Sequence, residues 1–294
     1  MNRQAFATCP VCAGTSFTTY VQFPQFEWLR CDCGAIYKRA ISEVAANSLS
    51  TDGAATVGSP SSTLDSFGEE GHYGRRYGAR HAHRVAKSRR QILDALNHTP
   101  PGPLLDLGCS LGYTLEAALG LKLEAVGADL SPLAVQHCRD LGFETALAPL
   151  EALPFADRRF QIVTMKHVLE HTAQPRQALA EVRRVLAPGG AVFIAVPDAG
   201  YWKARRAPAR SRFYRPDAHG GAEHQVYYSP PVLARLVTAA GFKVAAVHPQ
   251  LLHRLAGPVA RAGEMLLSAP RALGGLLRTS LGLRKEFWLV AVRD

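Results

Sequence analysis

The sequence predicts an α/β fold built around an open, doubly wound sheet of mostly parallel strands. The segment Leu104–Gly112 (LLDLGCSLG) passes from apolar residues to Asp106 and then to a turn of small residues. Tyr113–Leu119 follows with a helical pattern, and a second unit begins with the predicted strand Leu123–Ala128, which Asp129 closes. Repeated strand–turn–helix units form a nucleotide pocket at the carboxyl ends of their strands.

The turn after the first predicted strand has the composition expected where a ligand contacts the backbone. Gly108, Ser110 and Gly112 are small, so the backbone there stays open to close approach. Asp129 lies 21 positions after Gly108, about where such a unit presents a carboxylate to ribose hydroxyls. Ser131-Pro132 then supplies a helix cap with proline at the first helical position.

This stretch resembles the cofactor-binding half of the class I S-adenosylmethionine (SAM)-dependent methyltransferases. In that family the first acid and the glycine loop hold the methionine end of the cofactor, and the second acid holds the ribose. Pro149 stands where the family usually has an acid that recognises adenine, so backbone near Leu150 and the Glu151 side chain are expected to do so. The resemblance implies SAM as cofactor and these binding residues: Asp106, Gly108, Cys109, Ser110, Gly112, Tyr113, Asp129, Leu130, Leu150, Glu151 and Lys166.

The same glycine turn admits a hydrolase interpretation. Residues 108–112 fit G-x-S-x-G, the nucleophile elbow of α/β-hydrolases, with Ser110 as the nucleophile. A hydrolase would place earlier strands and an HGG-type loop upstream, where this sequence has cysteines and a polar tract. A nicotinamide site would require G-x-G-x-x-G, which the spacing does not match. SAM is therefore favoured, with the hydrolase as a minor alternative.

The rest of the chain continues the alternation of strands and helices. Further strands are predicted at Ala146–Ala148, Phe160–Met165, Ala191–Val196, from Gly241-Phe242 onward and at Phe287–Val292, with helices at about 174–186 and at Pro231–Ala240. The pattern VLEH…P…L.EV.RVLAPGG is again similar to small-molecule class I methyltransferases, so the resemblance covers residues 104–200 almost continuously. It implies a Rossmann-like sheet of seven strands whose last strand is antiparallel.

Four of the six cysteines lie near the start of the chain, as Cys9-x-x-Cys12 and Cys31-x-Cys33. Two thiolate pairs at such spacing can form a tetrahedral zinc site, with a strand at Ser16–Gln22 between them. A disulfide framework is disfavoured because no secretion signal precedes the cysteines. We therefore expect a structural zinc ion.

Composition divides the chain into three parts. Residues 1–41 are expected to form the zinc ribbon, and residues 42–70, rich in Ser, Thr, Ala and Gly, a flexible linker. Residues 71–294 would form the methyltransferase domain, with a helical insertion at about 251–285. That insertion mixes apolar residues with spaced arginines, so it could lie on an anionic membrane, cover the active site or form a dimer contact.

Positive charge is concentrated outside the predicted sheet. The net charge is +10, but residues 104–200 carry eight Lys and Arg against eleven Asp and Glu, which leaves +13 for the flanks. A basic rim suits an anionic partner such as a phosphate-bearing metabolite, nucleic acid or a membrane, although plain solvated surface explains it equally well. The basic segment His72–Arg90 contains Tyr73 and Tyr77, where similar methyltransferases fold over the cofactor, although a basic helix that only covers the core explains the segment equally well. With no apolar span or signal sequence, the expected location is the cytoplasm, with peripheral contact at the inner membrane face through 251–285.

Three histidines are candidates for the catalytic base: His167, His171 and His224. The acceptor pocket is predicted between the end of the fourth strand, with Lys166, and an arginine-rich loop at 201–215. His224 is favoured as the base because a polar, glycine-rich run precedes it, whereas His171 could simply begin a helix. An anionic group on the acceptor would be bound by Arg205, Arg206, Arg210 and Arg212.

The resemblance thus implies a methyltransferase acting on a small molecule, such as a sugar, lipid or envelope precursor with an anionic group. The run EH..YYS...L..L....GF, which begins at Glu223, is similar to methyltransferases with an N-terminal zinc ribbon, and many of those act on such compounds. One alternative is an rRNA or tRNA methyltransferase that uses the ribbon and the basic rim on phosphates, although no Asn-Pro-Pro-Tyr-like motif follows the fourth strand. Another is a non-catalytic protein that retains the fold to bind a partner.

Overall fold

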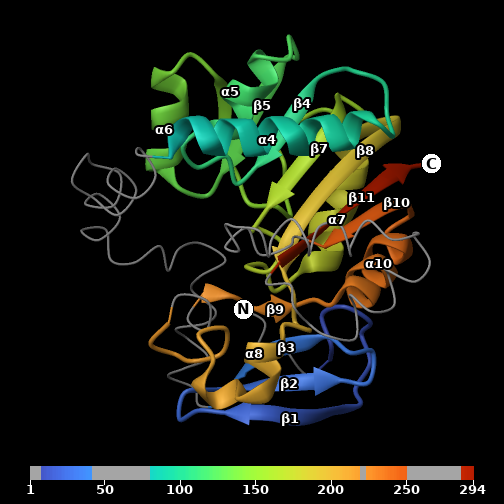
Figure 1. Ribbon diagram of the computed structural model, residues 1–294. Helices are drawn as coiled ribbons and strands as arrows, with labels where there is room; N and C mark the ends of the chain where they lie inside the picture. The colour runs from blue at the N-terminus through green and yellow to red at the C-terminus, as the bar shows by residue number, and fades with distance from the viewer. Residues whose placement is uncertain (1–7, 42–79, 219–222, 250–285) are drawn as a thin grey trace, which may run out of the picture.

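The computed structural model describes residues 8–41, 80–218, 223–249 and 286–294 (Figure 1). The predicted linker at 42–70, Tyr73 and Tyr77, and the predicted insertion at 251–285 lie outside these described residues. None of the helices in the described ranges combines the length and apolar content that a membrane crossing requires.

The main sheet has seven strands in the order β10-β11-β8-β7-β4-β5-β6. Their bounds are β4 Leu104–Leu107, β5 Ala125–Asp129, β6 Glu144–Leu147, β7 Phe160–Lys166, β8 Leu186–Pro197, β10 Phe242–Pro249 and β11 Glu286–Arg293. The strands from β4 to β8 pair in parallel, and β11 is antiparallel to both β8 and β10. The predicted Rossmann-like sheet with an antiparallel last strand is confirmed.

Several strand boundaries differ from the prediction, among them those of β6 and β8. The third strand is β6, which begins two residues before the predicted start at Ala146, because Glu144 and Thr145 pair with β5. Ala148 is outside the strand, and its N–H bonds to the carbonyl of Asp129. β8 begins at Leu186, which pairs with Phe160, so it includes the turn that was expected to precede it.

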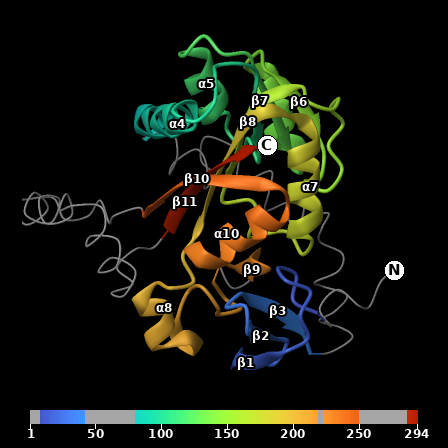
Figure 2. The same cartoon turned by 90° about the vertical axis from the view of Figure 1, so that its right-hand side faces the viewer.

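Helices cover both faces of the sheet (Figure 2). They are α4 His81–Leu96, α5 Tyr113–Leu119, α6 Pro132–Asp140, α7 Pro175–Val185 and α10 Pro230–Ala239, with the short α8 Trp202–Arg206 and the 3₁₀ turn η1 Pro208–Arg210. Buried residues of α4 and α5 share one core with the sheet, and those of α7 and α10 share another. The central strands are apolar because both of their faces are covered.

The start of α6 follows the predicted capping pattern. The Ser131 hydroxyl accepts a hydrogen bond from the Ala134 N–H at 3.4 Å, and Pro132 is the first helical residue. Proline costs nothing at this position, since its missing N–H would have no helical partner. The cap fixes the direction in which the chain leaves β5, and with it the position of Asp129.

The N-terminal strands form a second, antiparallel sheet, shown below the main sheet in Figure 1. β1 Phe17–Gln22, β2 Phe26–Cys31 and β3 Ile36–Ala40 are joined by β9 Val226–Tyr227, which comes from far along the chain and pairs with β3. This sheet of β1, β2, β3 and β9, called the ribbon sheet below, therefore contains residues from both predicted domains, 1–41 and 71–294.

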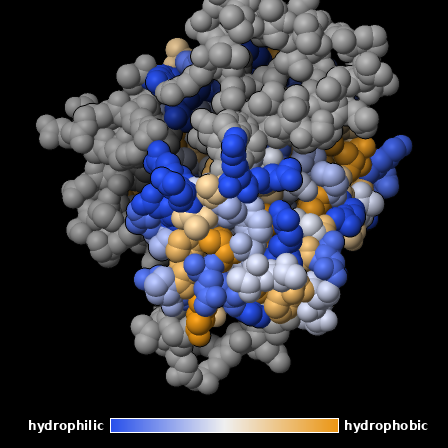
Figure 3. All heavy atoms as spheres, turned by 60° about the horizontal axis from the view of Figure 1, so that its bottom comes forward, coloured by the Kyte–Doolittle hydropathy of each residue, from blue (hydrophilic) through white to orange (hydrophobic). Residues whose placement is uncertain are grey.

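An aromatic cluster reinforces this junction. Trp28 is fully buried, and its indole N–H donates to the carbonyl of Tyr214 at 3.0 Å. The Trp28 ring lies 5.4 Å from the ring of Tyr214 and 5.2 Å from that of Tyr227. Such aromatic pairs contribute about 0.5–1.5 kcal/mol each beyond area burial. On the outer face of this end, hydrophilic and hydrophobic side chains are intermixed (Figure 3).

Candidate functional site

Asp129 lies at the carboxyl end of β5 and organises the glycine loop. Its carboxylate accepts the Ser110 N–H at 3.0 Å with one oxygen and the Ser131 N–H at 2.9 Å with the other. Burial raises the pKa of this carboxyl group, and hydrogen bonds from backbone N–H groups oppose that effect. Because a carboxylate has about four lone-pair sites, Asp129 keeps acceptor capacity for further hydroxyl donors.

The loop glycines are required by conformation and by packing. Gly108 and Gly112 have φ values of +71° and +74°, which favour glycine. A Cβ atom on Gly108 would lie 2.4 Å from a methyl carbon of Val168. The sequence interpretation attributed these small residues to ligand approach, but Val168 already requires a glycine at 108.

Asp106 and Lys166 form a charged pair beneath the loop. Asp106 is buried and accepts a hydrogen bond from the Thr164 hydroxyl at 2.5 Å. Lys166 is half-buried, and its ammonium donates to the hydroxyls of Ser88 on α4 at 3.0 Å and of Thr114 on α5. Burial raises the pKa of Asp106 and lowers that of Lys166, while each charge opposes the shift of the other. Asp106 therefore ties β4 to β7, and Lys166 ties β7 to the covering helices α4 and α5.

The other predicted cofactor residues surround the carboxyl edge of the sheet. Cys109 and Leu150 are buried, whereas Leu130 is 42% exposed. Tyr113 is half-buried at the start of α5, and its ring lies 5.1 Å from that of His81. The Glu151 carboxylate accepts a hydrogen bond from the Thr172 hydroxyl, so it is held by the segment that precedes α7.

These residues fit the cofactor that the resemblance implies. Asp129 offers acceptors to a vicinal diol, and the loop at 108–112 supplies backbone at the same edge of the sheet. Asp106 is 1% exposed and is engaged by Thr164, so in this conformation its part is to position the loop rather than to present an open carboxylate.

His167 is bound between two carboxylates. Its ring nitrogens lie 3.3 Å from Glu170 Oε1 and 2.9 Å from Glu286 Oε2, and Glu286 also pairs with Lys87 at 3.0 Å. Partial burial alone would lower the pKa of His167, but hydrogen bonds to Glu170 and Glu286 raise it to about 9. A group protonated at neutral pH cannot accept a proton there, so this arrangement disfavours the predicted role of His167 as a base.

His171 and His224 lie together with Glu170, although 53 residues separate the two histidines along the chain. One potential ligand atom from each of the three lies within 4.8 Å of the others, and the imidazole centroids are 4.6 Å apart. The Glu170 carbonyl holds the segments together by accepting the N–H groups of Gln225 at 2.7 Å and Val226 at 3.1 Å. The sequence analysis named both histidines but not Glu170, whose only signal was its position next to His171.

The tautomer of His224 follows from its hydrogen bonds. Its Nδ1 lies 2.9 Å from the Tyr227 hydroxyl, which donates its one hydrogen to the carbonyl of Phe213 at 2.5 Å. His224 Nδ1 must therefore carry a hydrogen and donate to Tyr227, which leaves the ring's lone pair on Nε2. Nε2 is the atom that can accept a proton or bind a metal ion.

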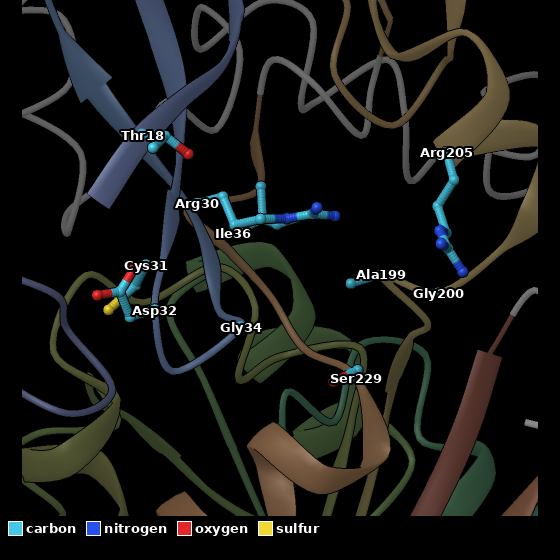
Figure 4. Close-up of a pocket in the computed structure, with 10 residues that line it drawn as sticks. All are labelled: Thr18, Arg30, Cys31, Asp32, Gly34, Ile36, Ala199, Gly200, Arg205 and Ser229. Carbon is cyan, nitrogen blue, oxygen red and sulfur yellow. The ribbon is translucent and has the colours of Figure 1, made fainter. Parts of the chain in front are cut away.

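A polar cavity of about 400 Å³ opens between the ribbon sheet and the loop after β8 (Figure 4). Arg30 projects from β2 on one side and Arg205 from α8 on the other, with Ser229 at the start of α10 below them. Arg205 alone of the four predicted arginines lines this cavity; Arg206, Arg210 and Arg212 are exposed elsewhere on the loop. The cavity contains none of the predicted cofactor residues.

The four N-terminal cysteines converge as the sequence spacing predicted. Cys9 and Cys33 Sγ atoms are 3.7 Å apart, those of Cys12 and Cys31 are 3.5 Å apart, and all four lie within 4.8 Å of one another. Zinc–sulfur bonds of about 2.3 Å in a tetrahedron give sulfur–sulfur edges of about 3.8 Å. Burial raises the pKa of Cys9 above its ordinary value and that of Cys33 to about 11, so a cation is needed to hold these groups as thiolates. The donor set fits zinc.

Comparison with known proteins identifies the core of the chain. A family model described as "Methyltransferase domain" matches residues 105–194. The chain is 33% identical over 118 residues to the ubiquinone biosynthesis O-methyltransferase of Methylococcus capsulatus, covering 38% of this chain and 50% of that protein. It is 35% identical over 109 residues to the demethylmenaquinone methyltransferase of Renibacterium salmoninarum, covering 36% of this chain and 46% of that protein. The chain therefore spans about half the length of these relatives.

Solved structures share the fold at low sequence identity. A SAM-dependent methyltransferase of Thermotoga maritima aligns with a TM-score of 0.54 and 17% identity, covering 76% of this chain and 97% of that one. A SAM-dependent methyltransferase of Archaeoglobus fulgidus aligns with a TM-score of 0.51 and 16% identity, covering 71% and 94%. At this level of identity the similarity concerns the fold alone.

Proposed function

We propose that the chain is a class I SAM-dependent methyltransferase that transfers a methyl group from SAM to a small-molecule acceptor, since a family model described as a methyltransferase domain matches residues 105–194. The observation that carries the proposal is Asp129, whose carboxylate joins the glycine loop to the end of β5 and keeps acceptor capacity for ribose hydroxyls. The hydrolase alternative with Ser110 as nucleophile is set aside, because the family match is to methyltransferases.

In this proposal the chain contributes positioning more than chemical activation. When bound, SAM supplies a methyl group already activated on a sulfonium centre. Asp129 would hold the ribose, the loop at 108–112 the methionine end, and residues near Leu150 the adenine. Asp106 ties β4 to β7, and Lys166 ties β7 to α4 and α5, which keeps that loop in place. Fixing two reactants in line and excluding water accounts for a large share of the rate that such a transfer needs.

The acceptor would bind at the carboxyl end of β7, beside Glu170, His171 and His224. Two relatives are named as methyltransferases of ubiquinone and menaquinone biosynthesis, which supports a small-molecule acceptor. An anionic group on the acceptor would bind in the cavity between Arg30 and Arg205. Arginine suits this role because its planar guanidinium can form paired hydrogen bonds with phosphate or carboxylate.

We further propose that Cys9, Cys12, Cys31 and Cys33 hold one structural zinc ion. The ribbon contributes three strands to the sheet that β9 completes, and β9 begins two residues after His224. A zinc-stabilised ribbon would therefore support the acceptor side of the site, in addition to folding the N-terminus.

The proposal is tested by calorimetric titration of the full chain with SAM and with its demethylated product, S-adenosylhomocysteine. Binding of both is expected, and labelled SAM incubated with a small-molecule extract should yield a labelled product. Heat-treated enzyme is the control for non-enzymatic methylation. Failure of the full chain to bind either compound would contradict the proposed function.

A further inference from the structure

We infer that Glu170, His171 and His224 form a binding site for a divalent transition-metal ion, separate from the cysteine site. Two imidazole nitrogens and one carboxylate oxygen are a donor set suited to Zn²⁺ and related ions. Mg²⁺ and Ca²⁺ prefer oxygen ligands. With bonds of about 2.1 Å, ligand atoms around a tetrahedral ion lie about 3.4 Å apart. Small side-chain rotations would bring the present set, within 4.8 Å, to that spacing.

The carboxylate of Glu170 gives a second reason to place a cation here. Glu170 is fully buried, and its Oε2 atom has no hydrogen-bond partner among the described residues. Its other oxygen faces His167 at 3.3 Å. A buried carboxylate oxygen without a partner is costly, and a metal ion between it and the two imidazoles would remove that cost.

Neighbouring residues orient the three ligand side chains through hydrogen bonds, as the hydrogen-bond partners of ligands do in known metal sites. The Tyr227 hydroxyl accepts the Nδ1–H of His224, which fixes the ring and leaves the ring's lone pair on Nε2. Glu170 is positioned by His167, and His167 is in turn fixed by Glu286. The backbone bonds from Gln225 and Val226 to the Glu170 carbonyl hold the two chain segments at a constant separation.

The metal site is inferred from these contacts. Only its location beside the acceptor rests on the proposed function. An ion bound to His224 Nε2 would occupy the nitrogen with which His224 would accept a proton if it acted as the predicted base. His171 is half-buried, so an ion held there can be reached from outside. The same residues thus support two exclusive roles, proton acceptor or metal ligand, and a binding experiment separates them.

The test is a metal count on the full-length protein titrated with Zn²⁺ and, in parallel, with Co²⁺. The wild type is expected to bind two ions per chain, one at the four cysteines and one at this cluster. Glu170→Gln and His171→Ala should each bind one ion fewer while keeping the cysteine-bound ion, whose cobalt spectrum is dominated by thiolate. Tyr227→Phe should weaken the second site by about 10- to 100-fold, as loss of an outer hydrogen bond does.

His137→Ala is the matched control, because His137 is also half-buried but lies on α6, outside the cluster. It should bind two ions. A wild type that binds only the cysteine-held ion overturns the inference and leaves His224 as the predicted base. Persistence of the second ion in both Glu170→Gln and His171→Ala also overturns it. Calorimetry with SAM on the same samples distinguishes this failure from failure of the proposed function.

Discussion

Replacing Asp129 with alanine is expected to weaken SAM binding about 10- to 150-fold. The change removes the carboxylate that would accept hydrogen bonds from the ribose. Hydrogen bonds to a charged group contribute about 1.5–3 kcal/mol, and every 1.4 kcal/mol is a factor of ten in affinity. The substitution also leaves the N–H groups of Ser110 and Ser131 without their acceptor, so the loop should become less ordered before the ligand arrives.

Asparagine at the same position separates loss of charge from loss of volume. Asp129→Asn keeps the shape of the side chain but replaces one carboxylate oxygen with an amide NH₂, which would face a backbone N–H donor. We therefore expect Asp129→Asn to bind SAM no better than Asp129→Ala. If only the volume of the side chain mattered, the asparagine variant would retain nearly full affinity.

The assay is isothermal titration calorimetry with SAM and S-adenosylhomocysteine. Asp140→Ala is the matched control, because this exposed carboxylate at the end of α6 accepts a hydrogen bond from Gln136 on the same helix. It should leave the affinity unchanged. Equal affinity in the wild type and in Asp129→Ala would refute the assignment of Asp129 to the ribose.

Three further changes test other parts of the structure. Cys9→Ser should lose the zinc ion held by the cysteines, as measured by elemental analysis, because three sulfur ligands would remain of four. Lys38 is fully buried, and burial lowers its pKa from 10.5 to about 7 against a smaller opposing effect of Glu223. Between these two pKa values the unfolded chain therefore binds more protons than the folded chain. The free energy of unfolding of the wild type, relative to that of Lys38→Met, should rise by up to about 1.4 kcal/mol per pH unit from pH 7 toward pH 10. Urea unfolding measures this difference. Gly108→Ala should cost about 2–4 kcal/mol in the same measurement, from its left-handed φ and from overlap with Val168.

Two of these changes have a control variant within the chain. Cys109→Ser removes a buried thiol that lies outside the zinc cluster, and it should keep the zinc ion. Gly189 has nearly the same φ as Gly108, at +73°, but nothing lies within 4 Å of an added Cβ, so Gly189→Ala should cost less than Gly108→Ala. Equal costs would show that contact with Val168 is unimportant. A pH-independent difference between the wild type and Lys38→Met would show that Lys38 is not desolvated.

The sequence predicted the region around the cofactor loop well, because its signals are local. α5 has the predicted bounds, and α6 begins with the predicted serine cap and proline. Glycine turns, caps and apolar periodicity act over a few residues, so they can be recognised without knowledge of the tertiary structure. The convergence of the four cysteines was likewise predictable, since zinc ligands follow short spacings within each pair.

The remaining features depend on contacts between residues far apart in the chain. β9 has only two residues, and its partner β3 lies about 190 positions earlier, so no local pattern indicates the pairing. The contact between His167 and Glu286 also joins distant positions, and it changes the protonation expected for that histidine. Glu170 carries no signal until the fold brings His224 beside it. The catalytic roles of the histidines were therefore beyond what spacing alone could assign.

A crystal structure of the full chain with S-adenosylhomocysteine tests the central claim most directly. The account predicts that both ribose hydroxyls contact the Asp129 carboxylate and that the amino-acid end lies over the loop at 108–112. It also predicts that the sulfur faces the carboxyl end of β7, beside Glu170 and His171. A ligand bound elsewhere on the chain, or a ribose turned away from Asp129, would contradict the account.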